Sequence, residues 1–224
     1  MAQLPEHQLL KADEVFKFHC HAGISCFTDC CRQLELALTP YDVLRLKKAL
    51  GLTSGRFLEQ YTVIEFGPED IHPRVYLGMV DDGQASCPFV GSEGCRVYND
   101  RPGACRTYPL GRGASLEAQG DKAIHILIRE PHCHGFAEDR EQTLEQWQND
   151  QDLQEYNHYN DEMLAIVNHP ALLAGQRMNR KQADDFILCL YDLDRFREKA
   201  AAGNQKDTAL LSLAIKCFIK QSFS

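Results

Sequence analysis

The chain has 224 residues, of which 44% are hydrophobic and 25% are charged, and its formal net charge is −8. This apolar content is sufficient for a folded core and excludes a wholly disordered chain. The acidic balance argues against a protein that binds nucleic acid through its phosphates, because such proteins carry basic patches.

Neither a secretory signal nor a membrane span is expected. Residues 1–10 include Pro5 and Glu6 and lack the apolar stretch of a signal peptide. The longest apolar runs, 186–191 and 209–215, are far shorter than the roughly 20 residues of a membrane-spanning helix. We therefore expect a cytoplasmic protein that does not contact a membrane.

The first half of the chain predicts short strands and helices. Apolar and polar residues alternate over 16–20, as in a half-buried strand. Thr39 and Pro40 are typical of an N-cap and a first helical residue, and Gly51 is typical of the position after a helix, so a helix is expected between them. A second helix is expected from Thr53 or Ser54 to Tyr61, with strands at 62–66, 74–80 and 122–129.

The second half predicts helices and no strands. Tyr156, Tyr159, Met163 and Ile166 keep helical spacing, and two more helices are expected at 183–198 and 207–221. The acidic segment 138–152, which contains the single tryptophan, is expected to be a solvated helix or, less simply, a docking site for a basic partner. The overall prediction is an α+β fold: a small mixed cysteine-cluster domain of short strands and helices over 16–135, followed by a helical C-terminal extension over 136–224 packed on it.

Ten cysteines are the most unusual feature of the composition. Eight of them precede residue 135: Cys20, Cys26, Cys30, Cys31, Cys87, Cys95, Cys105 and Cys133. Disulfides are rare in the cytosol, so we interpret these eight as metal ligands, because four thiolates suit a tetrahedral zinc or a cubane iron–sulfur cluster. Cys189 and Cys217 instead lie on apolar helical faces and are expected to be core residues.

Other polar residues flank the cysteines. His19, His21, His132 and His134 could replace a thiolate, although hydrogen bonding to sulfur or exposure to solvent is the simpler interpretation. Positive charges from Arg96, Arg101 and Arg106 could neutralise a thiolate cluster, or the three arginines could form surface ion pairs of little energetic value. Tyr98 and Tyr108 are expected to be packed aromatic residues.

The cysteine-containing stretches resemble the YkgJ-type family, which is known for a CxxCxxCC cluster and described as a zinc- or iron-chelating domain. The matching stretches are Phe18-x-Cys20, Cys26-x3-Cys30-Cys31, 38–46 (LTPYDVLRL), Cys87-Pro88-Phe89 and the segment from Cys95 to Pro109 that contains RPxxCRxYP. One departure concerns the first cysteines, where the gaps are five and three residues instead of two. The resemblance covers 16–135 and implies metal chelation by clustered cysteines.

The metal is left open between zinc and iron–sulfur, because thiolates suit both and disfavour magnesium and calcium. Irregular gaps and the relatives of the family favour a [4Fe–4S] cluster with a structural or redox role. Adjacent side chains diverge in extended backbone, so Cys30 and Cys31 are not expected to reach one ion, and two sites, or one site and a spare thiol, are possible.

Two other functions stay open. A flagellin lysine N-methylase is similar in its cysteine pattern, which would imply a cluster-containing protein-lysine N-methylase-like enzyme; however, Gln33 stands where a radical-SAM cysteine would be needed. The alternative is a metal-delivery or regulatory module. In either case the helical extension could meet a protein partner.

Overall fold

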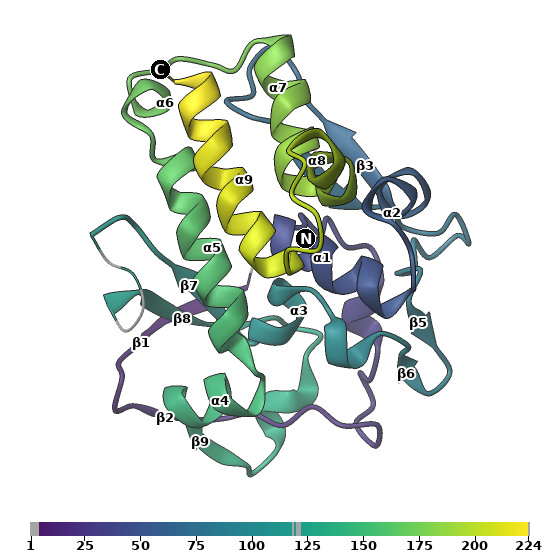
Figure 1. The fold of residues 1–224 in the computed structure, drawn as a ribbon. Helices are drawn as coiled ribbons and strands as arrows, with labels where there is room; N and C mark the ends of the chain where they lie inside the picture. The colour runs from purple at the N-terminus through teal and green to yellow at the C-terminus, as the bar shows by residue number, and fades with distance from the viewer. Residues whose placement is uncertain (1–4, 118, 120–121, 224) are drawn as a thin grey trace. The chain divides into compact units, whose positions relative to one another are not determined.

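The computed structural model describes residues 5–117, 119 and 122–223. It has an α+β fold with short antiparallel strands and a helical C-terminal part, as the sequence predicts (Figure 1). The chain forms two compact units, each made from two separate stretches. Unit 1 comprises Met1–Leu34 and Met79–Asn157, and unit 2 comprises Glu35–Gly78 and His158–Ser224.

Unit 1 contains an antiparallel sheet of order β1-β8-β7 and the strand pairs β2-β9 and β5-β6. Its elements are β1 (Glu6–Leu10), β2 (Val15–Lys17), the 3-10 helix η1 (Asp29–Cys31), β5 (Val90–Gly91), β6 (Gly94–Cys95), η2 (Tyr98–Asp100), α3 (Gly103–Thr107), β7 (Leu110–Gly113), β8 (Ile124–Arg129), η4 (His134–Ala137), β9 (Glu141–Thr143) and α4 (Leu144–Asp150). In the sheet, Leu9 pairs with Ile126, which pairs with Gly111 on its other side.

The core of unit 1 lies between the sheet, β2 and α4. Its buried members are Leu10, Phe16, Phe18, Leu110, Leu127, Trp147 and Leu153. Trp147 is only 6% exposed and meets the rings of Phe16 and Phe18 edge-on, with centroids 6.3 and 5.5 Å away. The interpretation of 138–152 as a solvated helix is therefore wrong at its centre, because one face of α4 is part of the core.

Unit 2 is mainly helical. Its elements are α1 (Pro40–Ala49), α2 (Ser54–Tyr61), β3 (Thr62–Glu65), β4 (Arg74–Leu77), α6 (Pro170–Leu173), α7 (Arg180–Phe186), a π-helical segment (Ile187–Tyr191), α8 (Leu193–Lys199) and α9 (Asp207–Ser222). Helix α5 (Leu153–Val167) begins in the last residues of unit 1 and continues into unit 2. Helices α1 and α9 both contact the π-helical segment, which is buried at Leu190 and Tyr191.

Helix starts are the best predicted features. The Thr39 hydroxyl accepts the Asp42 N–H at 3.2 Å, and the Asp42 carboxylate accepts the Thr39 N–H at 2.7 Å, which closes a capping box before Pro40. Gly51 follows α1 with φ of +66°, a conformation that favours glycine. The expected helices at 54–61 and 207–221 are also confirmed.

Several strand boundaries differ from those expected. The expectation of no strand after residue 135 is wrong, because β9 pairs with β2 and buries Gln142, a polar residue that gives no strand signal. Strand β2 ends at Lys17 instead of continuing to Cys20. The expected helix at 183–198 is interrupted at Asp192, where the backbone leaves helical geometry. Cys189 is buried as expected, whereas Cys217 is only partly buried.

The two units interleave along the chain. Residues 35–78 group with the C-terminal helices, whereas the sequence analysis placed them with the cysteines. The Leu38 N–H donates to the Val75 carbonyl, and the Tyr191 hydroxyl donates to the Leu38 carbonyl, which ties this insert to the later helices. The division into a cysteine-cluster domain over 16–135 and a helical extension over 136–224 packed on it stays a prediction.

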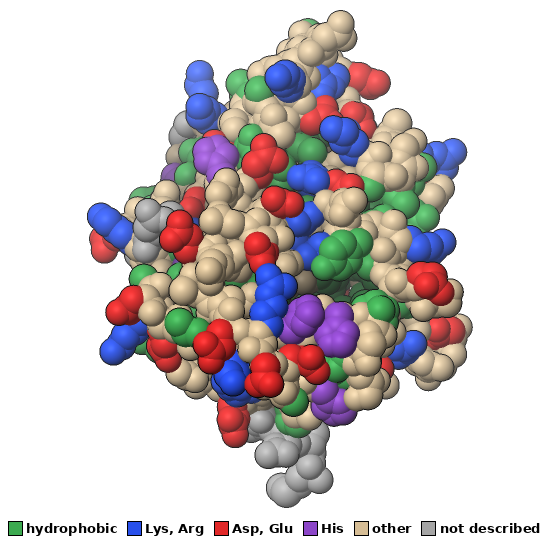
Figure 2. All heavy atoms as spheres, turned by 90° about the horizontal axis from the view of Figure 1, so that it is seen from below, with side chains coloured by type: hydrophobic (Ala, Val, Ile, Leu, Met, Phe, Trp, Pro, Cys, Tyr) green, Lys and Arg blue, Asp and Glu red, His purple; other side chains and the backbone are tan. Residues whose placement is uncertain are grey.

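Acidic and basic side chains are interspersed over the surface that Figure 2 shows. Among the helices of the described residues, none combines the length and the apolar character needed to cross a bilayer.

A buried charge cluster stabilises unit 2. The Lys47 side chain is 7% exposed, and its Nζ lies 2.9 Å from Asp194 Oδ1 and 3.3 Å from Asp207 Oδ2. Asp194 also accepts the backbone N–H of Ser54 at 2.6 Å and returns its own N–H to the Ser54 hydroxyl. The Asp194 carboxylate in α8 therefore binds groups from both α1 and α2.

We predict that Asp194→Ala lowers the free energy of unfolding by about 2–3 kcal/mol, because the buried ammonium of Lys47 loses its closer partner. Urea unfolding followed by far-UV circular dichroism measures this. The control is Glu59→Ala, which removes an exposed pair with Arg56 and should cost under about 1 kcal/mol. Equal losses in the two variants would contradict the prediction.

The same cluster predicts a pH dependence. Burial alone would raise the pKa of Asp194, but hydrogen bonds from Lys47 and Ser54 outweigh burial and hold the pKa below its usual value. A lowered carboxyl pKa contributes stability that is present above the ordinary pKa of about 3.9 and is lost as the pH falls towards the folded value. As the pH falls from about 6 to about 3, wild type should therefore lose more of its free energy of unfolding than Asp194→Ala does in the same urea assay.

Candidate metal centre

Backbone pairing brings the first cysteine to the last one. After β2, the Phe18 N–H donates to the Arg140 carbonyl at 3.1 Å, and the His19 N–H donates to the Gly135 carbonyl at 3.0 Å. Cys20 is thereby held beside the segment that carries Cys133. Gly135 is required at this contact, since a Cβ there would lie 2.6 Å from the Phe18 ring.

Successive turns carry the next three cysteines. The Asp29 N–H donates to the Cys26 carbonyl, and Thr28 adopts a left-handed conformation just before η1, which contains Cys30 and Cys31. The His134 N–H donates to Cys26 Sγ at 3.2 Å, so this turn also faces the Cys133 segment. A side-chain hydrogen bond of 2.6 Å between Ser25 Oγ and His134 Nδ1 joins the same two segments.

The middle cysteines join the group through the backbone of Cys31. The Cys87 N–H donates to the Cys31 carbonyl at 2.8 Å, and the Phe89 N–H lies 3.5 Å from Cys87 Sγ as a donor. The short β5-β6 pair sets Cys95 opposite Val90. Helix α3 follows and carries Cys105 on an exposed position.

All eight candidate thiols lie in unit 1 and influence one another electrostatically. Partial burial and the charges of Cys30, Cys133 and Cys26 raise the pKa of Cys20 to about 11. Burial raises the pKa of Cys87, of Cys95 and of Cys133, and neighbouring cysteines add to each shift. The charges of Cys87 and Cys105 contribute to the raised pKa of Cys31. The structure thus gathers thiols from distant parts of the sequence into one group. Five of them have thiolate forms that are costly without a cation: Cys20, Cys31, Cys87, Cys95 and Cys133.

The backbone conformation at Cys30 and Cys31 differs from the extended one that was expected to make their side chains diverge. They lie in a 3-10 turn instead of extended backbone, and their side chains hydrogen-bond to each other. This hydrogen bond lowers the pKa of Cys30 to about 7 and raises the pKa of Cys31. Cys30 also influences the pKa of Cys20, Cys87, Cys95 and Cys133, which gives it a central place in the group.

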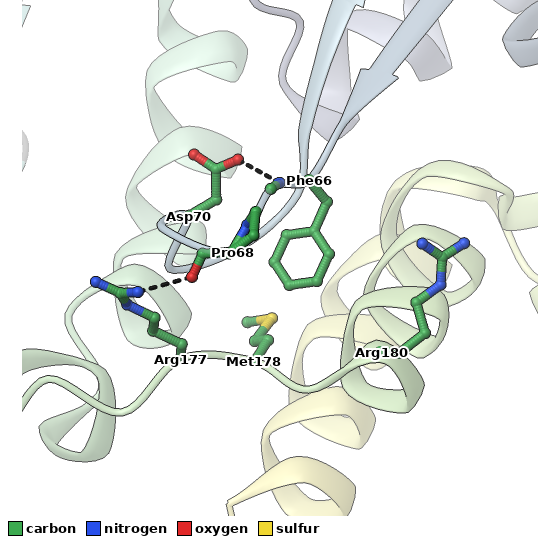
Figure 3. A pocket seen from close by; sticks show the side chains of 7 residues that line it. Phe66, Pro68, Asp70, Arg177, Met178 and Arg180 are labelled. Carbon is green, nitrogen blue, oxygen red and sulfur yellow. Dashed lines mark hydrogen bonds between the residues drawn. The ribbon is translucent and has the colours of Figure 1, made fainter.

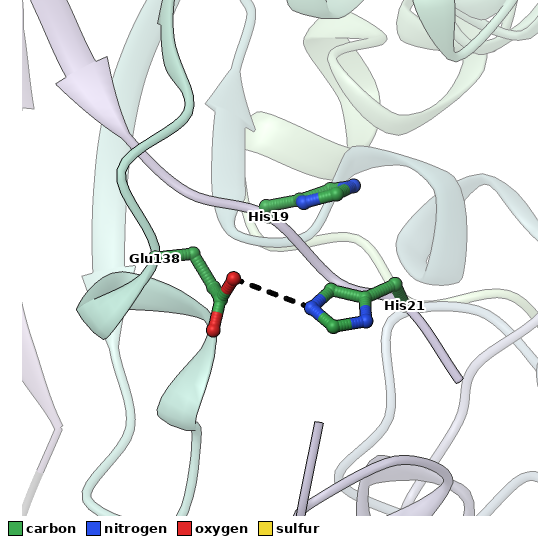
Figure 4. Close-up of side chains that lie close together, drawn as sticks. All are labelled: His19, His21 and Glu138. Atoms are coloured by element: carbon green, nitrogen blue, oxygen red, sulfur yellow. Dashed lines mark hydrogen bonds and ion pairs between the residues drawn. The ribbon is translucent and has the colours of Figure 1, made fainter. Parts of the chain in front are cut away.

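The tightest set of potential ligands is not made of cysteines. In the described part of the chain, ligand atoms that all lie within 4.8 Å of one another are found for His19, His21 and Glu138 (Figure 4). The rings of His19 and His21 lie side by side, 4.7 Å apart, because residues two apart in extended chain point to the same side.

The contacts of His21 favour a hydrogen bond over metal ligation. The Gly23 N–H donates to His21 Nδ1 at 3.1 Å, so the neutral ring carries its proton on Nε2. That proton points to Glu138 Oε2, 3.3 Å away. A ligating histidine normally donates its other N–H to an acceptor, whereas here the other nitrogen accepts.

The arginines of the motif do not share one environment. Arg101 and Arg106 are 8% and 3% exposed, so neither is a surface residue, whereas Arg96 is exposed. Arg101 stacks on the exposed ring of Tyr98 with 3.8 Å between guanidinium carbon and ring centroid. Tyr108 is partly buried and packs edge-on against Phe18, as expected for a packed aromatic.

Sequence reasoning missed Gln151. Its side-chain and backbone oxygens accept hydrogen bonds from Arg101 and Arg106, respectively. Gln151 lies in a polar stretch without a motif, so no sequence signal identifies it. Of the other two histidines that flank candidate cysteines, His132 contacts Glu130 and His134 hydrogen-bonds to Ser25.

A separate open pocket of about 280 Å³ lies in unit 2 (Figure 3). Phe66, Met178 and Arg180 line it, and Arg177 donates to the Pro68 carbonyl at 2.7 Å and to Glu69. Arg177, one of the two arginines that line the pocket, is thus already hydrogen-bonded within the unit, and no cysteine is among the lining residues.

Comparison with known proteins gave one match. The family model "CxxCxxCC: Putative zinc- or iron-chelating domain" matches residues 19–134, a little over half of the chain. No curated protein and no solved structure matches the chain. The matched range contains all eight candidate thiols, and its description agrees with the expected zinc or iron cofactor.

The close packing of Gly135 against the Phe18 ring gives a testable prediction. Gly135→Ala should lower the stability of unit 1 by about 1–3 kcal/mol, because the new Cβ overlaps the Phe18 ring and lies 3.2 Å from the His19 carbonyl oxygen. Fluorescence of Trp147, which shares a core with Phe18, reports urea unfolding of this unit.

Gly113→Ala is the matched control, since the nearest atom to its added Cβ is 4.0 Å away. It should change stability by no more than about 0.5 kcal/mol. If Gly135→Ala is as stable as Gly113→Ala, close packing at Gly135 is not what joins the segments.

Proposed function

The chain belongs to the CxxCxxCC family of zinc- or iron-chelating domains, and from this premise we propose that it holds a [4Fe–4S] cluster with a structural or redox role. The ligands come from the eight thiols of unit 1: Cys20, Cys26, Cys30, Cys31, Cys87, Cys95, Cys105 and Cys133. We expect Cys30, Cys87, Cys95 and Cys105 to be the most important of these.

The observation that carries the proposal is the gathering of these thiols. They come from three stretches of unit 1, at 20–31, 87–105 and 133, and each contributes to the electrostatic environment of others in the group. We propose the cytosol as the protein's location, where thiols stay reduced and available to a metal.

The spacing of the thiols supports a cluster over a single ion. Four sulfurs on one zinc at bond lengths of about 2.3 Å would lie about 3.8 Å apart. Among the described residues, no three cysteine sulfurs all lie within 4.8 Å of one another. An iron–sulfur cluster spans several metal atoms, so its thiolates stand further apart than those of a single zinc ion and need no such close trio.

The chain also offers groups that act on bound sulfur. The amide of His134 donates to Cys26 Sγ, and the amide of Phe89 donates to Cys87 Sγ. Such hydrogen bonds stabilise thiolates and set the reduction potential of a cluster. A bound cluster would supply electron transfer or a cross-link between chain segments. We further propose that the helical extension provides the surface for any protein partner.

Metal content tests the proposal directly. Protein purified without air should contain iron with a matching amount of acid-labile sulfide and should show broad charge-transfer absorption. Zinc alone in colourless protein would overturn the cluster and leave a structural zinc domain. Absence of both metals would overturn metal binding.

Substitution of single cysteines tests the ligand set. We expect Cys105→Ser to remove most of the bound metal and to lower solubility, because a lost ligand uncouples α3 from the group. Cys217→Ser in unit 2 is the matched control and should keep the wild-type metal content. Full metal retention by Cys105→Ser would exclude Cys105 as a ligand.

A further inference from the structure

Two guanidinium groups lie buried beside the thiols. Arg101 Nη1 donates to the Tyr98 carbonyl at 2.6 Å, and its Nη2 donates to the Gln151 side chain. Arg106 Nη1 donates to the Gln151 carbonyl at 2.7 Å, and its Nη2 donates to the Asn99 carbonyl. Each of these acceptors is a neutral oxygen, so the hydrogen bonds hold the two side chains in place without cancelling their charge.

The carboxylate that pairs with one of them is too exposed to balance both charges. Of the ion pairs within the described residues, the one that involves either guanidinium joins Arg106 to Asp152 at 4.0 Å. The Asp152 side chain is 88% exposed, so water screens it. Buried charges in proteins are normally paired, and two adjacent buried cations with neutral acceptors call for a buried anion.

Candidate thiolates lie close by in the fold, because Arg106 directly follows Cys105 within α3. The positive charge of Arg101 lowers the pKa of Cys20 and of Cys95, against burial and neighbouring thiols that raise them. Cys105 and Cys95 act in turn on Arg101. The charge of Arg101 thus acts with candidate ligands from two separate stretches of the sequence, Cys20 in the first and Cys95 and Cys105 in the second.

We propose that Arg101 and Arg106 are the built-in counter-charge of the metal centre, an inference that rests on the proposed function. Four thiolates on a Zn²⁺ ion leave two negative charges in excess, and a cubane cluster held by four thiolates is likewise anionic. Two buried guanidiniums match that excess. They stabilise the loaded centre, whereas in the metal-free protein their own charges are poorly compensated.

The test compares wild type with Arg101→Gln, Arg101→Lys and Arg96→Gln, each purified without air. Gln removes the charge and keeps a hydrogen-bond donor, and Lys keeps the charge. Arg96 is the matched control, because it also lies near Cys95 and donates to the Pro88 carbonyl but is exposed to solvent.

We expect Arg101→Gln to lose metal to EDTA at about a tenfold lower chelator concentration than wild type. Arg101→Lys should recover most of this difference, and Arg96→Gln should stay within about twofold of wild type, because exposed charges are screened. For an iron–sulfur centre, loss of the positive charge should also make the reduction potential more negative. For a zinc centre, competition for added Zn²⁺ replaces the potential measurement and should show the same tenfold change.

Urea unfolding with and without metal distinguishes an electrostatic role of Arg101 from a purely structural one. The proposal requires Arg101→Gln to destabilise the metal-loaded protein more than the metal-free protein. Equal destabilisation of both forms, or an Arg101→Lys variant as defective as Arg101→Gln, would overturn it and leave the arginines a purely structural role. If wild type itself contains neither iron nor zinc, the proposed function fails before this comparison is reached.

Discussion

The candidate metal centre depends on one constraint: the backbone must bring together thiols that are more than a hundred residues apart in the sequence. The pairing of β2 with β9 does this, and the hydrogen bonds from Phe18 and His19 to the 135–140 segment extend it towards Cys20. Core packing reinforces it, since Phe18 contacts Trp147 and approaches Gly135 too closely for a side chain there. The N-terminal cysteines are therefore positioned by apolar packing and amide pairing, and the thiols themselves need not supply the whole free energy of assembly.

The electrostatics of the site explain why such support is needed. Burial raises the pKa of Cys87, Cys95 and Cys133, so the protein alone does not favour their ionised forms. Metal binding must displace these protons, which makes the affinity fall as the pH falls. The Phe89 amide at Cys87 and the charge of Arg101 near Cys20 and Cys95 act in the opposite direction on these pKa values. The site balances burial, which excludes water, against local positive charge, which keeps sulfur ionised in the loaded state.

Local signals in the sequence predicted local structure well, and long-range pairing was out of their reach. The capping box at Thr39 and the stop at Gly51 are encoded within one helix, so α1 could be read directly. Strand β9 could not, because Gln142 is buried only through its pairing with Phe16. The eight cysteines were identifiable as a chemical set, but the 3-10 turn that brings Cys30 and Cys31 together follows from the left-handed Thr28, which no sequence pattern indicates. Gln151 was invisible for the same reason: its role exists only after two arginines fold onto it.

The interleaving of the two units has a consequence for the order in which the chain can mature. During synthesis the first four cysteines emerge early, but Cys133 and β9, the strand that pairs with β2, follow only after the whole 35–78 insert, which belongs to the other unit. Closing this long loop costs chain entropy, and non-local contacts of this kind slow folding. The insert itself finds its partners only when the C-terminal helices exist. Nascent chains thus carry unpaired thiols and an unfinished core at the same time.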